Sequence, residues 1–265
     1  MLTDIRAQAA KYYDLCPDMP ADVPFYESLV PYPGARVLEL GCGTGRVLVP
    51  LAGVCGYIHG LDLSQAMIDI CRKKLDTAGI ATTKARAEVK DITNFALNQT
   101  FDLIIAPYRV LQNLEADAAV EGLFRCIRQH LAPGGSCILN VFRPKRDPEA
   151  MRREWCNDKE KLSWEAAVEG GRVTCHERWL RMDPDKMVLY PELIYRRYQD
   201  GALVDEAVLK IAMRCYYPEQ FEQLIIKQGF RVVRRWGGYE GEPYGQGPEL
   251  VIQFTQSNTS SLELP

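Results

Sequence analysis

Residues 39–45 read Glu-Leu-Gly-Cys-Gly-Thr-Gly, directly after a short apolar run and before an apolar-periodic stretch that begins at Val47. This order predicts a strand, a glycine-rich turn and a helix in direct succession. Glycines in such a turn let backbone N–H groups approach a ligand closely, and the helix N-terminus that follows is electropositive. The dinucleotide fingerprint G-x-G-x-x-G would place its third glycine at position 46, which is Arg46 here. The spacing therefore disfavours NAD and FAD as ligands.

An acidic residue ends the next predicted strand, which covers residues 57–62. This residue, Asp62, follows the glycine-rich turn at a distance that suits a nucleoside site. A carboxylate at the end of the second strand can accept hydrogen bonds from both hydroxyls of a ribose. The glycine-rich turn alone could be only a tight connection between strand and helix. Together, the two features predict nucleoside binding.

The alternation of apolar strands and amphipathic helices continues to about residue 143. Further strands are expected at 84–90, 101–106 and 136–142, and helices at 64–75 and 115–131. Strands that are apolar on both faces and alternate with helices predict a parallel sheet covered on two sides. We therefore expect an α/β core.

The pattern changes after Pro144. Extended stretches between about 160 and 214 are separated by turn signals, which predicts a meander of antiparallel strands. A helix over 218–227 and strands over 230–236 and 249–254 then return to the core. We expect a helical cap at 1–33 with short helices at 3–15 and 22–31, a ligand-binding core at 34–145, an inserted β lid at 146–217, the return of the core at 218–256 and a flexible tail at 257–265.

In combination with three further motifs, the glycine-rich turn resembles the class I S-adenosylmethionine-dependent methyltransferases. The other motifs are residues 60–64 together with Met67, residues 90–92, and residues 131–135. The resemblance covers residues 35–143 well and the last 40 residues moderately. It implies a Rossmann-like class I methyltransferase fold, with a mainly parallel seven-stranded sheet and an inserted antiparallel β lid. It also implies S-adenosyl-L-methionine as the cofactor and no metal.

The resemblance implies a cofactor site made by residues that match the family motifs. These residues are Tyr12, Glu39, Gly41, Cys42, Gly43, Gly45, Asp62, Leu63, Met67, Asp91, Ile92 and Ala106. The glycines would lie against the methionine moiety and the ribose, and Glu39 would support the amino end of the cofactor. Leu63 and Ile92 would enclose the adenine, whose exocyclic amine Asp91 would bind.

Three further stretches, at 11–14, 106–114 and 214–221, are similar to bacterial small-molecule methyltransferases. These include the amino-sugar N-methyltransferases and, more distantly, glycine N-methyltransferase. In such relatives an N-terminal helix carrying tyrosine folds over the cofactor, and an antiparallel insertion roofs the substrate pocket. We therefore expect Tyr12 at the cofactor and Tyr13 at the reaction centre, although both tyrosines could instead be core residues of a docking helix.

The candidate catalytic residues are Tyr13, Arg109 and Asn113. Many relatives carry histidine where this chain has Asn113, and an amide cannot take a proton. The remaining mechanism is methyl transfer by proximity and exclusion of water. Arg109 either contacts a substrate anion or pairs with a surface acid. The segment 239–245 either borders the active site or caps the edge of the sheet.

The composition of the 265 residues limits the classes of partner. With 32 basic and 35 acidic residues, the chain lacks the cationic field that nucleic-acid binding requires. No apolar run approaches the roughly 18 residues of a membrane span, and the first residues do not read as a secretory signal. The nine cysteines form no C-x-x-C pair, which argues against zinc and against a disulfide framework. We expect a cytoplasmic monomer or homodimer that binds neither nucleic acid nor membrane.

These observations predict an enzyme that transfers a methyl group from S-adenosylmethionine to a nitrogen or oxygen of a small-molecule substrate. Nitrogen is favoured because an amine can attack as the free base, without a strong general base in the site. Two alternatives stay open: a protein or RNA methyltransferase, and a non-catalytic regulatory subunit that binds the cofactor.

Overall fold

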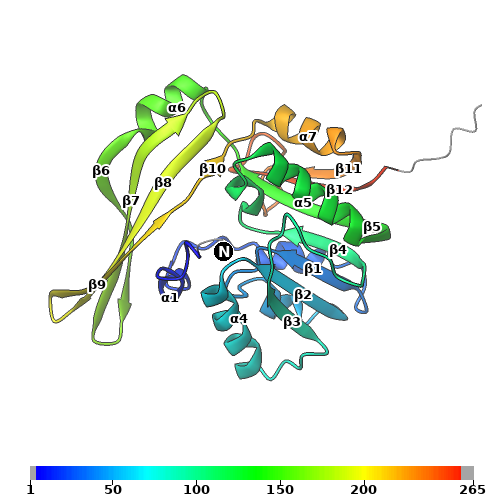
Figure 1. Ribbon diagram of the computed structural model, residues 1–265, viewed down its shortest axis with the longest axis horizontal. Coiled ribbons are helices and arrows are strands. Elements are labelled where there is room, and N and C mark those ends of the chain that lie inside the picture. The colour runs from blue at the N-terminus through cyan, green and yellow to red at the C-terminus, as the bar shows by residue number, and fades with distance from the viewer. Residues whose placement is uncertain (1–3, 258–265) are drawn as a thin grey trace, which may run out of the picture.

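The computed structural model describes residues 4–257, apart from the side chain of Trp155. Seven strands form the core sheet in the order β11-β12-β5-β4-β1-β2-β3 (Figure 1). They are β1 (Arg36–Leu40), β2 (Tyr57–Asp62), β3 (Ala85–Val89), β4 (Phe101–Ala106), β5 (Leu131–Phe142), β11 (Phe230–Trp236) and β12 (Glu249–Gln256). Strands β1 to β5 pair in parallel, and β12 is antiparallel to both of its neighbours.

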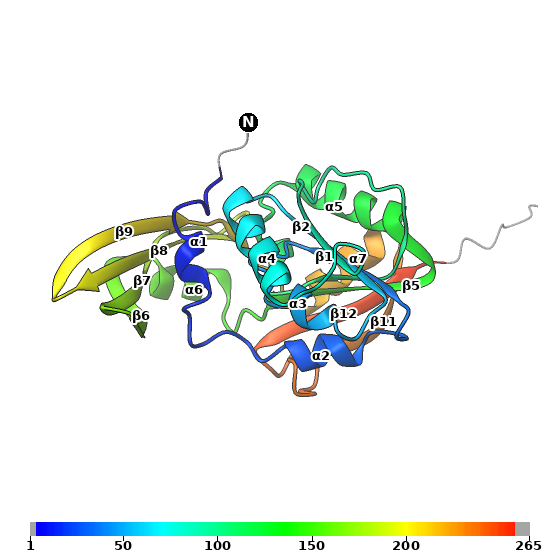
Figure 2. The ribbon, with the colours of Figure 1, turned by 90° about the horizontal axis from the view of Figure 1, so that it is seen from below.

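Helices cover both faces of this sheet. One face carries α5 (Asp117–His130) and α7 (Pro218–Lys227), and the other carries α2 (Val23–Ser28), α3 (Leu48–Leu51) and α4 (Gln65–Thr77). Figure 2 shows α5 and α2 on opposite sides of the strands. The helix ends follow from local chemistry: the Ser64 hydroxyl accepts a hydrogen bond from the Met67 N–H and so caps α4, and Pro218 occupies the first turn of α7.

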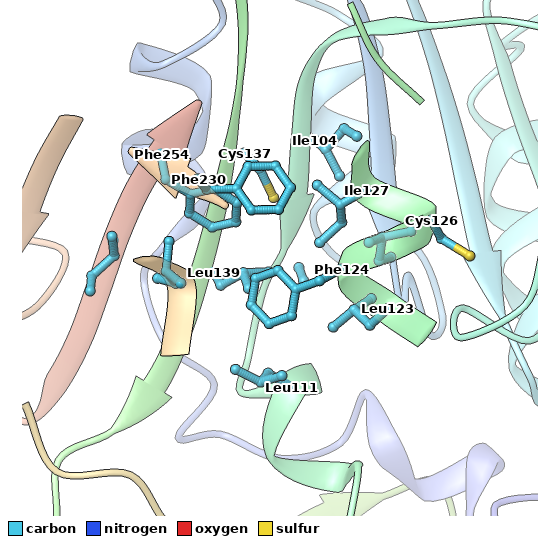
Figure 3. Close-up of a cluster of buried hydrophobic side chains, with 14 of the residues drawn as sticks. Ile104, Leu111, Leu123, Phe124, Cys126, Ile127, Cys137, Leu139, Phe230 and Phe254 are labelled. Carbon is cyan, nitrogen blue, oxygen red and sulfur yellow. The ribbon is translucent and has the colours of Figure 1, made fainter. Parts of the chain in front are cut away.

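The core on the α5 side is centred on three phenylalanines from three elements (Figure 3). Phe124 of α5, Phe230 of β11 and Phe254 of β12 are each at most 2% exposed, and the ring centroids of Phe230 and Phe254 are 5.0 Å apart. Burial of such apolar surface is the main stabilising contribution to a domain of this size. It fixes the antiparallel strands β11 and β12 against the parallel part of the sheet.

A second sheet is formed by antiparallel strands inserted between β5 and α7. It comprises β6 (Asn157–Val168), β7 (Gly171–Asp183), β8 (Val188–Gln199), β9 (Ala202–Lys210) and β10 (Met213–Arg214). Figure 1 shows it projecting from the core, with the N-terminal helix α1 (Ala10–Tyr13) between the two. The mainly parallel seven-stranded sheet and the antiparallel insertion are as predicted.

Local predictions differ from the structure at three places. A helix, α6 (Pro148–Trp155), begins inside the segment expected to be all β, and its cap is a hydrogen bond of 2.8 Å from the Ala150 N–H to the Asp147 carboxylate. The Asp-Pro pair at 147–148 is the signal for this helix start. Both expected N-terminal helices are shorter, and β5 begins at Leu131 rather than at 136. Residues 1–3 of the expected cap and 258–265 of the expected tail lie outside the described residues.

The N-terminal segment 4–16 touches both sheets. On the core side, Asp14 accepts a hydrogen bond of 2.7 Å from the Thr44 hydroxyl and pairs with Lys74 at 2.7 Å. On the other side, Asp205 of β9 accepts a hydrogen bond from the Tyr12 hydroxyl and pairs with Lys11. This segment therefore links the glycine-rich turn to the second sheet.

Candidate functional site

The glycine-rich turn lies at the carboxyl end of β1, between the loops that follow β2 and β4. Gly43 has φ of +53°, and a Cβ built on it would meet nothing within 4 Å. At Gly41 a Cβ would lie 2.5 Å from a methyl carbon of Val110, and at Gly45 it would lie 2.6 Å from the Cys71 sulfur. Gly41 and Gly45 are therefore needed for packing, whereas Gly43 opens towards space that a ligand can fill.

Asp62 holds this turn in place from the end of β2. One carboxylate oxygen accepts a hydrogen bond of 2.9 Å from the Gly43 N–H, and the other accepts one of 2.8 Å from the Ser64 N–H. Asp62 is only 9% exposed. Each oxygen retains a lone pair, so the carboxylate can still accept hydrogen bonds from a diol.

The predicted adenine-binding residues lie on the loops that follow β2 and β3. Thr93 donates two hydrogen bonds to Oδ1 of Asp91, from its N–H at 2.8 Å and its hydroxyl at 2.7 Å, which leaves Oδ2 for a ligand. Leu63 is 45% exposed although it is apolar, and Ile92 is only partly buried. A flat apolar ring would cover such surface favourably.

Among the predicted cofactor residues, Cys42, Met67 and Ala106 have small or apolar side chains that are buried in the core. The Cys42 side chain packs in the core beside Gly60, the Met67 side chain is 2% exposed, and Ala106 is 1% exposed. The side chains of Cys42 and Met67 therefore pack in the core below the glycine-rich turn and are not exposed to a ligand. At Ala106, the backbone at the end of β4 is the part that faces the neighbouring loops.

Glu39 is a buried acid with an unused hydrogen-bonding atom. The residue is 2% exposed, and Oε2 has no hydrogen-bond partner among residues 4–257. Burial raises the pKa of the Glu39 carboxyl well above its usual value, and the Arg46 guanidinium nearby opposes this shift. Arg46 is itself paired with the fully buried carboxylate of Asp22. A cationic ligand group would therefore satisfy Glu39.

The segment between β11 and β12 packs against α2 through one aromatic residue. Tyr239 packs against Phe25 and Tyr26 of α2, with ring centroids 5.5 and 6.1 Å apart. The hydroxyls of Tyr26 and Tyr239 are buried and interact with each other, and both lie in the electrostatic environment of Asp22. Sequence reasoning noted the length and aromatic content of this segment but did not place it.

Two tyrosines stand at the front of the site, from different elements. Tyr13 of α1 lies beside the Arg46 guanidinium, and burial raises the pKa of its phenol. Tyr108 follows β4 and is 37% exposed, with Arg46 and Arg109 guanidinium carbons 5.6 and 5.8 Å from its ring centroid. Sequence reasoning missed Tyr108, although its position just after the end of a parallel strand is a signal for a binding residue.

The structure places Tyr12 against the second sheet. Tyr12 is 3% exposed and stacks on Tyr195 of β8, with ring centroids 5.6 Å apart, while its hydroxyl bonds to Asp205. Successive helical residues point about 100° apart, so only one of the two adjacent tyrosines can face the glycine-rich turn. Tyr13 takes that direction, and Tyr12 faces the second sheet.

Arg109 and Asn113 also have internal partners. The Arg109 guanidinium donates to Glu249 of β12, with Nε 3.0 Å from Oε1, and Glu249 is 6% exposed. The partner is thus a buried acid, neither the surface acid nor the substrate anion considered above. Asn113 accepts a hydrogen bond of 3.1 Å from Arg6 and donates one of 3.3 Å to the Arg109 carbonyl, so its amide ties the N-terminal segment to the core.

Comparison with known proteins finds relatives of the core. Residues 37–135 match the family described as a methyltransferase domain. Aklanonic acid methyltransferase DauC of Streptomyces sp. (strain C5) is 33% identical over 84 residues, which are 31% of this chain and 38% of that relative. Residues 37–135 of this chain are thus similar to a methyltransferase domain, and the chain spans less than two thirds of the length of this relative.

Solved methyltransferases share the fold over almost the whole chain. The CcbJ methyltransferase from Streptomyces caelestis superimposes with a TM-score of 0.77 at 23% identity, over 96% of this chain and 98% of its own. CalS10 from Micromonospora echinaspora, an amino pentose methyltransferase solved with S-adenosylmethionine, gives a TM-score of 0.64 at 22% identity, over 89% of each chain. The predicted fold class is thereby confirmed.

The residues present fit that cofactor. Open space in front of Gly43, free lone pairs on Asp62, an exposed apolar side chain at Leu63 and the unpartnered oxygen of Glu39 correspond to a ribose, an adenine and an ammonium group. Within the described ranges, no group of three or more His, Cys, Asp or Glu side chains could hold a metal ion. No helix of residues 4–257 is long and apolar enough to cross a membrane.

Proposed function

We propose that this protein transfers a methyl group from S-adenosylmethionine to a nitrogen or oxygen atom of a small metabolite. The observation that carries the proposal is the open space at Gly43 beside the Asp62 carboxylate, together with the buried Glu39 carboxyl, which interacts electrostatically with Asp62 and has one oxygen without a partner in the described chain. The Asp62 carboxylate suits a diol and the Glu39 carboxyl suits an ammonium group. A nucleoside joined to an amino acid has both of these groups.

The residues of the core would hold the cofactor in a single orientation. Asp62 would accept from the ribose hydroxyls, Oδ2 of Asp91 would accept from the adenine amine, and Glu39 would face the amino end. When bound, S-adenosylmethionine supplies a methyl group on a sulfonium, which transfers in line to a lone pair. The contribution of the protein is therefore orientation and exclusion of water.

The nucleophile is most simply a nitrogen atom. Among Tyr13, Tyr108 and Tyr195, burial raises every phenol pKa, so these side chains are neutral near pH 7 and are poor proton acceptors. The amide of Asn113 cannot accept a proton, and it already bonds to Arg6 and to the Arg109 carbonyl. An amine can attack as the free base and release its proton to water afterwards.

A small substrate is supported by the elements around the site. Tyr195 of the second sheet interacts electrostatically with Tyr108 of the core and with Tyr13 of the N-terminal segment. Figure 1 shows α1 and the second sheet standing in front of the carboxyl ends of the core strands. We infer that they act as a lid over the site. The description of CalS10 as an amino pentose methyltransferase is consistent with a substrate of this size.

Calorimetric titration with S-adenosylmethionine, S-adenosylhomocysteine and NAD in parallel tests the cofactor part of the proposal. Binding of the first two and not of NAD is expected. Metabolite amines and phenols are then screened for formation of S-adenosylhomocysteine, with Asp62→Ala as the inactive control. Binding of NAD alone would overturn the proposed function, and turnover on proteins or RNA but on no metabolite would overturn the substrate class.

A further inference from the structure

The turn that follows β4 has an unusual backbone conformation. Tyr108 and Arg109 have φ of +56° and +68°, so two successive residues with side chains lie in the left-handed region. This region is unfavourable for residues other than glycine, and it persists only where the surroundings hold it. Residues in such conformations concentrate at binding and catalytic sites.

Three side chains hold this turn. The Asn140 side-chain carbonyl accepts a hydrogen bond of 3.1 Å from the Arg109 N–H, and the Asn140 amide donates one of 3.0 Å to Oε2 of Glu249. The guanidinium of Arg109 closes the network onto the same carboxylate. Asn140 is fully buried and Glu249 is 6% exposed, so the network is shielded from water. Hydrogen bonds to charged groups are strong in such surroundings.

The turn sets the position of two groups that face the cofactor loop. Val110, the next residue, has its methyl groups so close to Gly41 that no Cβ would fit there. Tyr108, the residue before Arg109, is presented beside Arg46 and remains 37% exposed. A displacement of this turn would therefore move the glycine-rich loop and the Tyr108 ring together.

We propose that Arg109, Asn140 and Glu249 form a positioning unit that holds the turn 107–110, and that Tyr108 contacts the bound ligand. The positioning unit fixes Val110, which packs against Gly41. In this way Glu249 of β12 affects the position of the glycine-rich turn. This inference rests on the proposed function, because it assigns these residues to the same cofactor site.

The first test compares two buried arginine–glutamate pairs. Arg109–Glu249 and Arg178–Glu192 have nearly equal side-chain exposures, 34% and 7% against 32% and 5%, but the second pair lies within the second sheet. Glu249→Gln and Glu192→Gln both remove one charge without changing the shape of the side chain. Glu249→Gln is expected to weaken binding of S-adenosylhomocysteine about tenfold, since small displacements in a site are costly. Glu192→Gln is expected to leave the affinity unchanged, even where both variants lower the melting temperature.

The outcomes separate the two proposals. Wild-type protein that does not bind S-adenosylhomocysteine overturns the proposed function. Wild-type protein that binds it, together with a Glu249→Gln affinity equal to that of Glu192→Gln, overturns the positioning unit.

The second test uses the wild-type chain and does not depend on a variant that folds. Tetranitromethane nitrates exposed tyrosines, and Tyr32, which is 50% exposed and lies away from the site, serves as the internal reference for Tyr108. Peptide mass spectrometry is expected to show slower nitration of Tyr108, and not of Tyr32, when S-adenosylhomocysteine is present. Equal protection of both tyrosines, or of neither, in protein that binds the ligand would overturn the role of Tyr108.

Discussion

The core sheet and the second sheet of this protein bury their strands to different extents. In β1, four of the five residues are buried, whereas in β6 only one of twelve is. Helices cover both faces of the core sheet, but the second sheet packs one face against the short N-terminal segment. We therefore expect the core sheet, which carries the glycine-rich turn, to be the more rigid of the two.

Two buried glutamates show the same contrast in their chemistry. Glu192 of the second sheet is 4% exposed and is bound by both Arg178 and Lys210. Although burial opposes it, these two cations lower the pKa of Glu192. Glu39 of the core is equally buried, yet one of its oxygens has no hydrogen-bond partner in the described chain and its pKa is raised. The Glu192 carboxylate is paired within the fold, whereas the Glu39 carboxyl keeps an oxygen that, as we propose, a ligand would bind.

The largest effect is expected from truncation of matched leucines in the two sheets. Leu139 of β5 is fully buried, and Leu209 of β9 is 5% exposed. We expect Leu139→Ala to lower the free energy of unfolding by about 4 kcal/mol and Leu209→Ala by about 2 kcal/mol, because the one-sided sheet can relax into the cavity. Denaturant unfolding measures both. Equal losses would contradict the claim that the core is the more rigid of the two.

The second-largest effect is expected from the loss of Asp62, the acid at the end of β2. Asp62→Ala removes charge-assisted hydrogen bonds of roughly 1.5–3 kcal/mol, so the affinity for S-adenosylmethionine should fall about tenfold or more. Calorimetry measures the change. Glu160→Ala, which removes an acid paired with Arg196 in the second sheet, is the control and should leave binding unaltered. An unchanged affinity in Asp62→Ala would show that the cofactor lies elsewhere.

A pH dependence of binding should follow from Glu39. Because burial raises its pKa, free protein holds a proton on this carboxyl at pH values where an ordinary glutamate is ionised. The ammonium group of S-adenosylhomocysteine favours the ionised form, so binding releases this proton. Affinity should rise by up to about tenfold per pH unit until the raised pKa is passed, and then level off.

Titrations in two buffers of different ionisation enthalpy count the released proton, and Glu39→Gln is expected to remove the slope. An identical slope in the variant would assign the proton to another group.

At Glu192 the pKa is lowered instead of raised, and this affects the stability of the fold. The stabilising contribution of the ionised Glu192 is present above the ordinary carboxyl pKa and is lost as the pH falls through the lowered pKa. Acid should therefore weaken the second sheet.

The smallest effect is expected at the contact between the N-terminal segment and the second sheet. Tyr12→Phe removes the hydrogen bond to Asp205, whose side chain is 36% exposed, so the loss should stay below about 1 kcal/mol. Trypsin cleavage after Lys11 should become faster. Tyr198→Phe, at the far end of β8, is the control and should not change the cleavage rate; equal rates in all three proteins would mean that the hydroxyl bond does not hold the segment.

The sequence by itself predicted the secondary-structure elements whose positions depend on local patterns. Strand β2, the cap of α4 at Ser64 and the limits of α7 all agree with their predicted positions, because apolar periodicity, a capping hydroxyl and a proline at the helix start act within a few residues. The glycine spacing at 41–45 and the acid at 62 likewise predicted that these two motifs meet at the carboxyl edge of the sheet, where a hydrogen bond of 2.9 Å joins Gly43 to Asp62.

Only the tertiary structure could decide which side chains complete the site. Glu249 lies 140 positions from Arg109, and no local pattern pairs them. Tyr12 and Tyr13 are equivalent in the sequence, but the packing of α1 between two sheets turns one away from the cofactor loop and the other towards it. Elements form from interactions between near neighbours, whereas these assignments depend on which distant surfaces the folded chain brings together to exclude water.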